Sequence, residues 1–252
     1  MIEIIVAILP VILIGMYIYF KDKEREPLYI LFVLLIGGTL SATTTLSVNS
    51  MIDIFLPLAT TPIGEMNTIE ILLYSFVVVS VTEELSKIFY LYIFSYNSKE
   101  NNYSFDMIVY GVISALGFAL IENLLYVLSY GTETGILRGL TAIPLHACTG
   151  ALMGEYLGKA KKRELRGDNP TKYKLLAIII PICIHGMYDF CAYTGTFEYL
   201  IMVITSIITL TVIIVNKSSK TDVKIVFENQ YCSNCGTKVV APYCKKCGKK
   251  QD

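Results

Sequence analysis

The sequence has little charge for its length. Only 17% of the 252 residues are charged, and 21 Lys and Arg balance 21 Asp and Glu, so the formal net charge is zero. This balance does not indicate a nucleic-acid partner, and we predict none. By contrast, 54% of the residues are hydrophobic, and the mean hydropathy is +0.57. This composition lies outside the range of soluble domains and predicts a protein embedded in a lipid bilayer.

The sequence also lacks the short motifs of the common hydrolases. It contains no H-E-x-x-H helix, no G-x-S-x-G turn and no cysteine–histidine signature, so nothing supports a protease of those classes. Only two histidines are present, His146 and His185.

Long apolar segments dominate the rest of the chain. A helix of about 20 residues spans the hydrocarbon core of a bilayer. We therefore predict an all-α polytopic membrane protein with about seven transmembrane helices, at residues 3–20, 28–48, 69–96, 105–130, 136–157, 175–193 and 197–215.

Two segments of the first third need an interpretation. Residues 3–20 are interpreted as a retained anchor, because Glu3 stands where a signal peptide has basic residues and no small-residue cleavage site follows. Residues 49–67 contain Pro57, Pro62 and Gly64 and are interpreted as an exposed or interfacial loop.

Four cysteines near the C-terminus form two C-x-x-C pairs, each followed by a glycine, Gly236 or Gly248. Four thiolates at this spacing can surround one zinc ion tetrahedrally, and the glycines permit the positive-φ turns that direct N–H groups at sulfur. Two disulfides are the alternative, which a reducing cytoplasm disfavours. We predict a structural zinc ribbon at residues 231–250, joined by a linker at 217–230 to a membrane domain at 1–216, with the ligands Cys232, Cys235, Cys244 and Cys247.

Charged and polar residues interrupt four successive predicted spans at similar depth. A charged group near the bilayer centre costs roughly 2.5–3.5 kcal/mol even on the lenient insertion scale, so such residues need partners or a function. The four motifs are Glu83-Glu84-x-x-Lys87, Phe118-x-x-x-Glu122-Asn123, His146-x-x-x-Gly150 and His185-x-x-x-Asp189.

Each motif alone has a structural explanation. A single histidine can be a hydrogen-bonded core residue, and the Glu–Lys set can be a salt bridge that fixes packing. One shared polar cavity explains all four together. Such a cavity suits hydrolysis, because a carboxylate can act as a base toward water and an imidazole can orient that water or stabilise the oxyanion. Two histidines and a glutamate also match the ligands of catalytic zinc sites, and the residues leave the use of a metal open.

Together the four motifs resemble the PrsW family of bacterial intramembrane proteases, which is distantly similar to the CAAX prenyl endopeptidases and bacteriocin-processing membrane proteases. The resemblance covers residues 1–215 and implies a bacterial cell-membrane protease that cleaves a membrane-anchored protein, such as an anti-sigma factor. It implies a catalytic core of Glu83, Glu84 and His185. Glu122, His146 and Asp189 would support that core or bind a metal, and Lys87, Phe118 and Asn123 would assist them. The ribbon would be an addition that could bind a cytoplasmic partner.

Two other classes of function remain open at this point. Carboxylates and histidines at the bilayer midplane also occur in proton- or ion-coupled transporters. Those proteins are expected to show inverted repeats and broken helices, which this sequence does not clearly contain. The second alternative is a non-catalytic scaffold or sensor that acts through the ribbon.

The distribution of lysine and arginine predicts the orientation in the membrane. The loop from Lys159 to Lys174 is strongly basic and should be cytoplasmic. Counting spans from it places the ribbon inside, and the N-terminus and the 131–135 loop outside. A cysteine introduced between residues 131 and 135 should react with an impermeant reagent on intact cells, whereas one introduced between 159 and 174 should not. Labelling of the second from outside would contradict this orientation.

Overall fold

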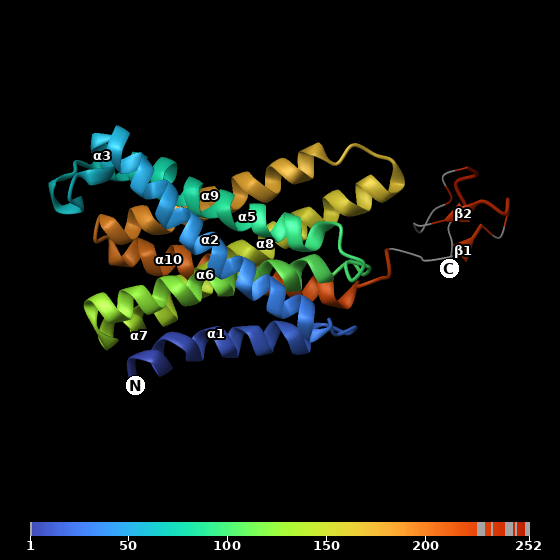
Figure 1. The fold of residues 1–252 in the computed structure, drawn as a ribbon, viewed down its shortest axis with the longest axis horizontal. Coiled ribbons are helices and arrows are strands. Elements are labelled where there is room, and N and C mark those ends of the chain that lie inside the picture. The colour runs from blue at the N-terminus through green and yellow to red at the C-terminus, as the bar shows by residue number, and fades with distance from the viewer. Residues whose placement is uncertain (1, 226–229, 233, 240–243, 245, 250–252) are drawn as a thin grey trace.

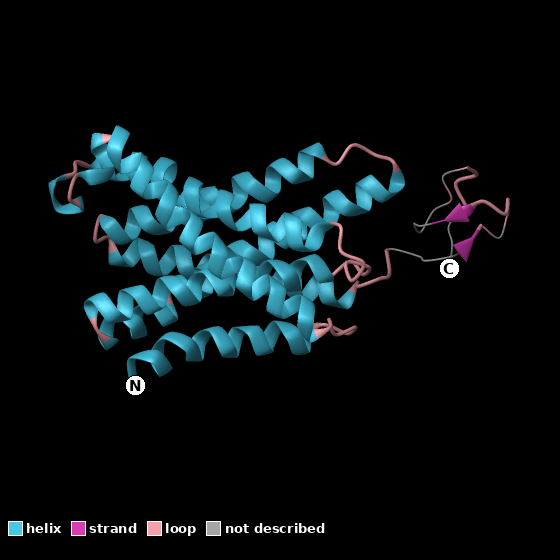
Figure 2. Cartoon of the chain, in the orientation of Figure 1, coloured by secondary structure: helices cyan, strands magenta, loops and turns pink. Residues whose placement is uncertain are grey.

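The computed structural model describes residues 2–225, 230–232, 234–239, 244 and 246–249. In this part of the chain nearly all regular structure is helical, and two strands of two residues each lie near the C-terminus (Figure 2). Six helical stretches are long and apolar enough to cross a membrane: α1 (Ile2–Lys21), α2 (Leu28–Phe55), α6 (Asp106–Tyr130), the consecutive helices α7 (Thr132–Leu140) and α8 (Ala142–Arg166), α9 (Thr171–Tyr193) and α10 (Phe197–Lys220).

A further helical segment covers residues 68–96 and is built from four pieces in register: α4 (Thr68–Leu73), the π-helix η2 (Tyr74–Ser80), α5 (Val81–Leu91) and the π-helix η3 (Tyr92–Tyr96). It begins at a capping box, in which the Asn67 side chain accepts hydrogen bonds from the backbone of Ile69 and Glu70, and Glu70 accepts one from Asn67 N–H. At 1.5 Å per residue the segment is roughly 43 Å long, enough to cross a bilayer. The predicted all-α membrane fold is confirmed.

The prediction of a loop at residues 49–67 was wrong over its first part. Helix α2 continues to Phe55, and Leu56 is the first extended residue, with φ −119° and ψ 102°. The polar residues Asn49 and Asp53 do not break a helix, whereas a proline disfavours helical geometry in the residue before it, so the helix ends before Pro57. Only short helices follow, α3 (Pro57–Thr60) and the 3₁₀ turn η1 (Ile63–Glu65).

Helix α6 lies in the centre of the bundle and packs against α1, α2 and α8 (Figure 1). Glycines allow the close approach. A Cβ atom on Gly38 of α2 would lie 2.0 Å from the Ser114 carbonyl oxygen, and one on Gly154 of α8 would lie 1.9 Å from that of Met107. Gly111 and Gly150 face each other across the α6–α8 contact in the same way. Backbones can approach this closely only where small residues such as glycine lie at the contact.

The segment after the last span differs in part from the expected linker. Helix α10 extends to Lys220. Beyond it, Ile225 N–H donates to the Asn102 carbonyl at 2.6 Å, and Ser104 N–H donates to that of Val223 at 3.0 Å. Residues 222–225 are therefore paired with the loop before α6, while residues 226–229 lie outside the described part of the chain.

The ribbon contains one antiparallel pair, β1 (Gln230–Tyr231) and β2 (Lys238–Val239). Gly236 and Gly248 adopt φ values of 68° and 72°. Their N–H groups donate to the carbonyls of Cys232 and Cys244, each at 2.8 Å. Two glycine turns of the same geometry thus follow the two C-x-x-C pairs, as the sequence predicted.

Candidate active site

The four polar motifs meet inside the helix bundle. Helix α5 contributes Glu83, Glu84 and Lys87; α6 contributes Phe118 and Glu122; α8 contributes His146; and α9 contributes His185 and Asp189. All of them except Glu122 are buried, and the side chain of Glu122 is only 21% exposed. The side chains of the four motifs therefore converge at one place in the membrane domain, as the sequence predicted.

Lys87 is at the centre of the network. Its ammonium donates to Glu84 Oε1 at 2.8 Å, to Glu83 Oε2 at 3.3 Å and to His146 Nδ1 at 2.9 Å. It also lies 4.0 Å from the centre of the Phe118 ring, a cation–π distance. All three N–H bonds of the ammonium are therefore used, and the charge is compensated without water.

His146 connects Lys87 to helix α6. Because its Nδ1 accepts from Lys87, its proton is on Nε2, which donates to Glu122 Oε2 at 2.7 Å. Glu122 Oε2 also accepts from Arg138 Nη2 of α7 at 2.8 Å. Both nitrogens of His146 are therefore engaged in this arrangement.

His185 is held differently. Its Nδ1 donates to Glu84 Oε1 at 2.7 Å, so Nε2 points the other way. Nε2 lies 3.4 Å from Asp189 Oδ2 and 3.7 Å from Glu83 Oε2. Asp189 Oδ2 is buried and has no hydrogen bond of good geometry among the described residues. His185 therefore presents a fixed nitrogen toward two carboxylates.

The adjacent glutamates occupy different environments. Glu83 lines a cavity of about 400 Å³ together with Glu122 and Asp189. Glu84 is fully buried behind it, between Lys87 and His185. Successive residues of a helix point about 100° apart, so the two glutamate side chains leave α5 in different directions.

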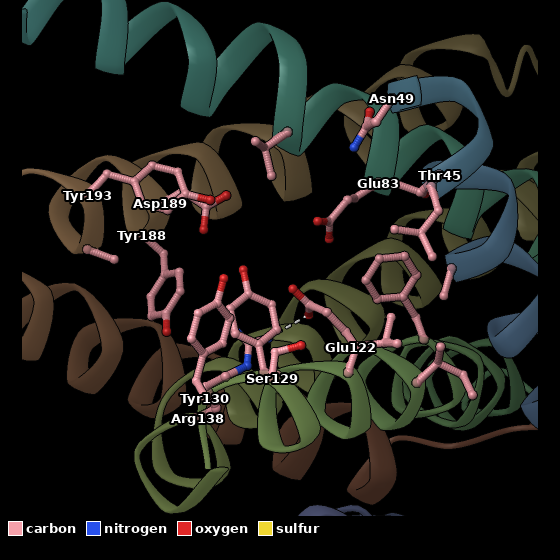
Figure 3. A pocket seen from close by; sticks show the side chains of 18 of the residues that line it. Thr45, Asn49, Glu83, Glu122, Ser129, Tyr130, Arg138, Tyr188, Asp189 and Tyr193 are labelled. Atoms are coloured by element: carbon pink, nitrogen blue, oxygen red, sulfur yellow. Dashed lines mark ion pairs between the residues drawn. The ribbon is translucent and has the colours of Figure 1, made fainter. Parts of the chain in front are cut away.

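Figure 3 shows the carboxylates of Glu83, Glu122 and Asp189 pointing toward the cavity from three different helices. Five tyrosines surround them: Tyr74, Tyr126, Tyr130, Tyr188 and Tyr193. Helix α2 also lines the cavity, through residues such as Thr45 and Asn49, which lie near Glu83 in Figure 3. The cavity thus combines acidic groups with aromatic and hydroxyl-bearing side chains.

Two residues change the predicted site. Arg138 was not predicted, although an arginine in an apolar segment is a signal that could have identified it. It binds Glu122, and its guanidinium lies 3.7 Å from the centre of the Tyr126 ring. Asn123, predicted as a supporting residue, is not brought to the cavity. It is buried on another face of α6 and donates to the Ala7 carbonyl of α1 at 3.4 Å.

The donor set of the cavity fits a metal ion. Ligand atoms of Glu83, His146 and His185 lie within 4.8 Å of one another. Two further observations favour a metal. Asp189 Oδ2, which has no hydrogen bond of good geometry among the described residues, lies beside His185 Nε2. The other nitrogen of His185, Nδ1, is bound to the carboxylate of Glu84, an arrangement typical of ligating histidines. Both nitrogens of His146 are engaged, so it could join only if Lys87 released Nδ1 or Glu122 released Nε2.

The C-terminal cysteines form a second cluster that can hold a metal. The four sulfurs lie within 4.8 Å of one another. Cys232 and Cys247 Sγ are 3.4 Å apart, and Cys235 and Cys244 Sγ are 3.5 Å apart. These distances exceed the roughly 2.05 Å of a disulfide and approach the ~3.8 Å between thiolates bound tetrahedrally at ~2.3 Å.

Comparison with known proteins gives a consistent result. The family model described as "PrsW family intramembrane metalloprotease" matches residues 26–216. The chain is 33% identical over 188 residues to "Protease PrsW" of Oceanobacillus iheyensis, covering 73% of this chain and 80% of that protein. It is 35% identical over 195 residues to "Protease PrsW" of Clostridioides difficile, covering 74% and 77%. With "Protease PrsW" of Halalkalibacterium halodurans it shares 40% over 118 residues, covering 47% and 54%. No solved structure is significantly similar.

The central role of Lys87 can be tested through stability. Replacing Lys87 by Met should destabilise the folded protein by about 3–5 kcal/mol, because two buried glutamates lose their compensating charge. Lys159→Met is the matched control. Lys159 pairs with Glu155 on the surface at 44% exposure, and its loss should cost about 1 kcal/mol or less. Thermal or denaturant unfolding in detergent measures both. Equal effects would show that the ammonium does not hold the site together.

Proposed function

The chain belongs to the PrsW family of intramembrane proteases, and from this premise we propose that it hydrolyses peptide bonds of membrane-anchored proteins at the base of the tyrosine-lined cavity. The observation that carries the proposal is that Glu83 and Asp189, which both line that cavity, lie 3.7 and 3.4 Å from Nε2 of the buried His185. No simple packing role requires two carboxylates beside one imidazole nitrogen at the edge of a cavity.

In the proposed reaction Glu83 is the general base. Its carboxylate takes a proton from a water molecule in the cavity, and the water oxygen attacks the carbonyl carbon of the scissile bond. When the C–N bond breaks, the proton passes to the leaving nitrogen. His185 Nε2, near both Glu83 and Asp189, is placed to orient the water or to stabilise the oxyanion.

The remaining residues hold Glu83 and His185 in position. Glu84 holds His185 through Nδ1, so its role is to orient the imidazole. Lys87 compensates the negative charge of both glutamates. Glu122 and His146 continue the network to α6 and α8, where Arg138 completes it. A site whose supporting groups are themselves fixed keeps its reactive atoms in place.

A metal ion could be held by His185 Nε2 and Glu83, with Asp189 or His146 as a third ligand. When bound, such an ion would supply Lewis-acid activation of the water and of the scissile carbonyl. The roles of Glu84 and Lys87 in orienting and compensating these ligands would be the same.

The substrate we propose is a protein with a single membrane anchor, such as an anti-sigma factor cleaved in regulated proteolysis. Family membership supports the protease, and the cavity volume of about 400 Å³ suits a few residues of an extended chain, not a folded domain. We further propose that the cysteine cluster binds zinc and serves as a docking module for a cytoplasmic partner.

Replacing the proposed base gives the first test. Glu83→Gln should lower the cleavage rate by about 10²–10⁴, since an amide keeps the size of the side chain but cannot accept the proton. His185→Ala should be comparably inactive. The measurement is cleavage of a single-pass substrate in proteoliposomes at equal protein abundance.

The matched control is Glu70→Gln, which removes a glutamate of the same helical segment from its capping box outside the cavity. It should cleave at close to the wild-type rate. Near wild-type cleavage by both site variants would overturn the proposed function. Adding a chelator to the wild type and to Cys232→Ser in parallel separates a metal in the cavity from zinc in the ribbon.

The zinc proposal predicts that Cys232→Ser reduces bound zinc by about one ion per chain, measured by elemental analysis, because the fourth thiolate is lost. The ribbon should unfold, since so small a module has no other core, while membrane insertion is retained. Cys183→Ser, at an exposed cysteine of α9, should keep its zinc. Unchanged zinc in Cys232→Ser would contradict the proposal.

A further inference from the structure

A second buried acidic cluster lies far along the bundle from the proposed active site, at the ends of α1 and α6. Asp22 and Glu26 belong to the loop between α1 and α2, and Asp106 is the first residue of α6. Their exposed fractions are 4%, 4% and 0%. One carboxylate oxygen from each lies within 4.8 Å of the other two.

The hydrogen bonds of the cluster leave several oxygens unused. Asp106 Oδ2 accepts from the N–H groups of Asn102 and Tyr103, at 2.8 and 2.7 Å, but its Oδ1 has no partner. Glu26 Oε2 accepts from the Tyr110 hydroxyl at 2.5 Å. Neither oxygen of Asp22 has a hydrogen bond of good geometry among the described residues, although the residue is buried. An unpartnered buried carboxylate is costly, and Asp22 is aimed at two others.

All three side chains of the cluster are acidic. Among the described residues no lysine or arginine forms a salt bridge with any of the three carboxylates. A fourth acid, Asp222, lies close by and accepts from Ser104 Oγ and from Phe105 N–H, both at 2.9 Å. The site therefore favours any group that brings positive charge.

The chemistry of the oxygens without hydrogen bonds indicates which kind of ligand the cluster can bind. All of them are carboxylate oxygens, with no cysteine or histidine among them, and oxygen-only sites suit hard divalent cations. We propose that Asp22, Glu26 and Asp106 bind a divalent cation of the Mg²⁺, Ca²⁺ and Mn²⁺ class.

The site would join parts of the chain that are distant in sequence. Asp22 and Glu26 follow α1, Asp106 begins the central helix α6, and the backbone around Asp106 is paired with residues 222–225 after α10. A bound cation would tie the first, central and last membrane helices together at one end of the bundle. Its role is therefore structural, and it does not depend on the proposed protease activity.

The test uses the full chain in detergent, with its zinc restored, and Mn²⁺ as the probe followed by electron paramagnetic resonance. Asp22→Asn should bind about one Mn²⁺ fewer per chain than the wild type, and excess Mg²⁺ should displace that ion from the wild type. Asp53→Asn is the matched control, because Asp53 is an exposed aspartate of α2. It should bind Mn²⁺ as the wild type does.

The melting temperature gives a second readout, because the difference between the wild type and Asp22→Asn should change sign when Mg²⁺ is added. Without divalent ions Asp22→Asn should melt no lower than the wild type, since it loses an uncompensated buried carboxylate. With saturating Mg²⁺ the melting temperature of the wild type should rise by several degrees and exceed that of Asp22→Asn, because a ligand that binds only the folded state stabilises that state.

A second variant covers the case in which Asp22→Asn does not fold. In Asp106→Asn the remaining side-chain oxygen can still accept from Asn102 and Tyr103, while the free ligand oxygen is replaced by an amide. It should show the same loss of one Mn²⁺. Wild-type Mn²⁺ binding by the folded variants, or a wild-type melting temperature unaffected by Mg²⁺, would overturn the proposal.

Discussion

The membrane domain depends on one buried ammonium group. Lys87 donates to two glutamates and a histidine from two helices and lies over an aromatic ring of a third. Without it, α5 would carry two carboxylates into the centre of an apolar bundle, which burial penalises by several kcal/mol per charge. With it, the negative charge is compensated locally and His146 has a defined tautomer. The acidic side chains can then serve chemistry without unfolding the protein that contains them.

This network requires helices that approach one another closely. The glycine contacts of α6 with α2 and α8 bring backbones into contact at Gly38, Gly111 and Gly154. Larger residues there would move α8 away from α6, and with it His146 from Glu122. The small residues set the spacing of the helices, and this spacing determines whether the polar groups can meet. The glycine contacts and the polar network are therefore coupled.

The sequence was sufficient to identify most of the membrane domain. Long apolar runs predict the spans, and charged residues within them indicate a site, because both follow from the cost of placing polar groups in lipid. One exception was the end of α2, where polar residues suggested a loop but only Pro57 stops the helix. Arg138 and Asn123 show a second limit. A span pattern does not tell which polar residue faces the cavity, and the structure directs Arg138 to Glu122 and Asn123 to α1.

What the sequence alone determined is the inventory: an all-α membrane protein, four polar motifs and four cysteines with metal-ligand spacing. Each of these is local, because it depends on composition, on helical periodicity or on the distance between neighbours in the chain. The tertiary structure decided which of the two adjacent glutamates lines the cavity, that the other, Glu84, is hydrogen-bonded to His185, and that Asp22, Glu26 and Asp106 lie close together. These facts depend on the rotation and packing of helices that are distant in sequence, and interactions between neighbouring residues do not specify them.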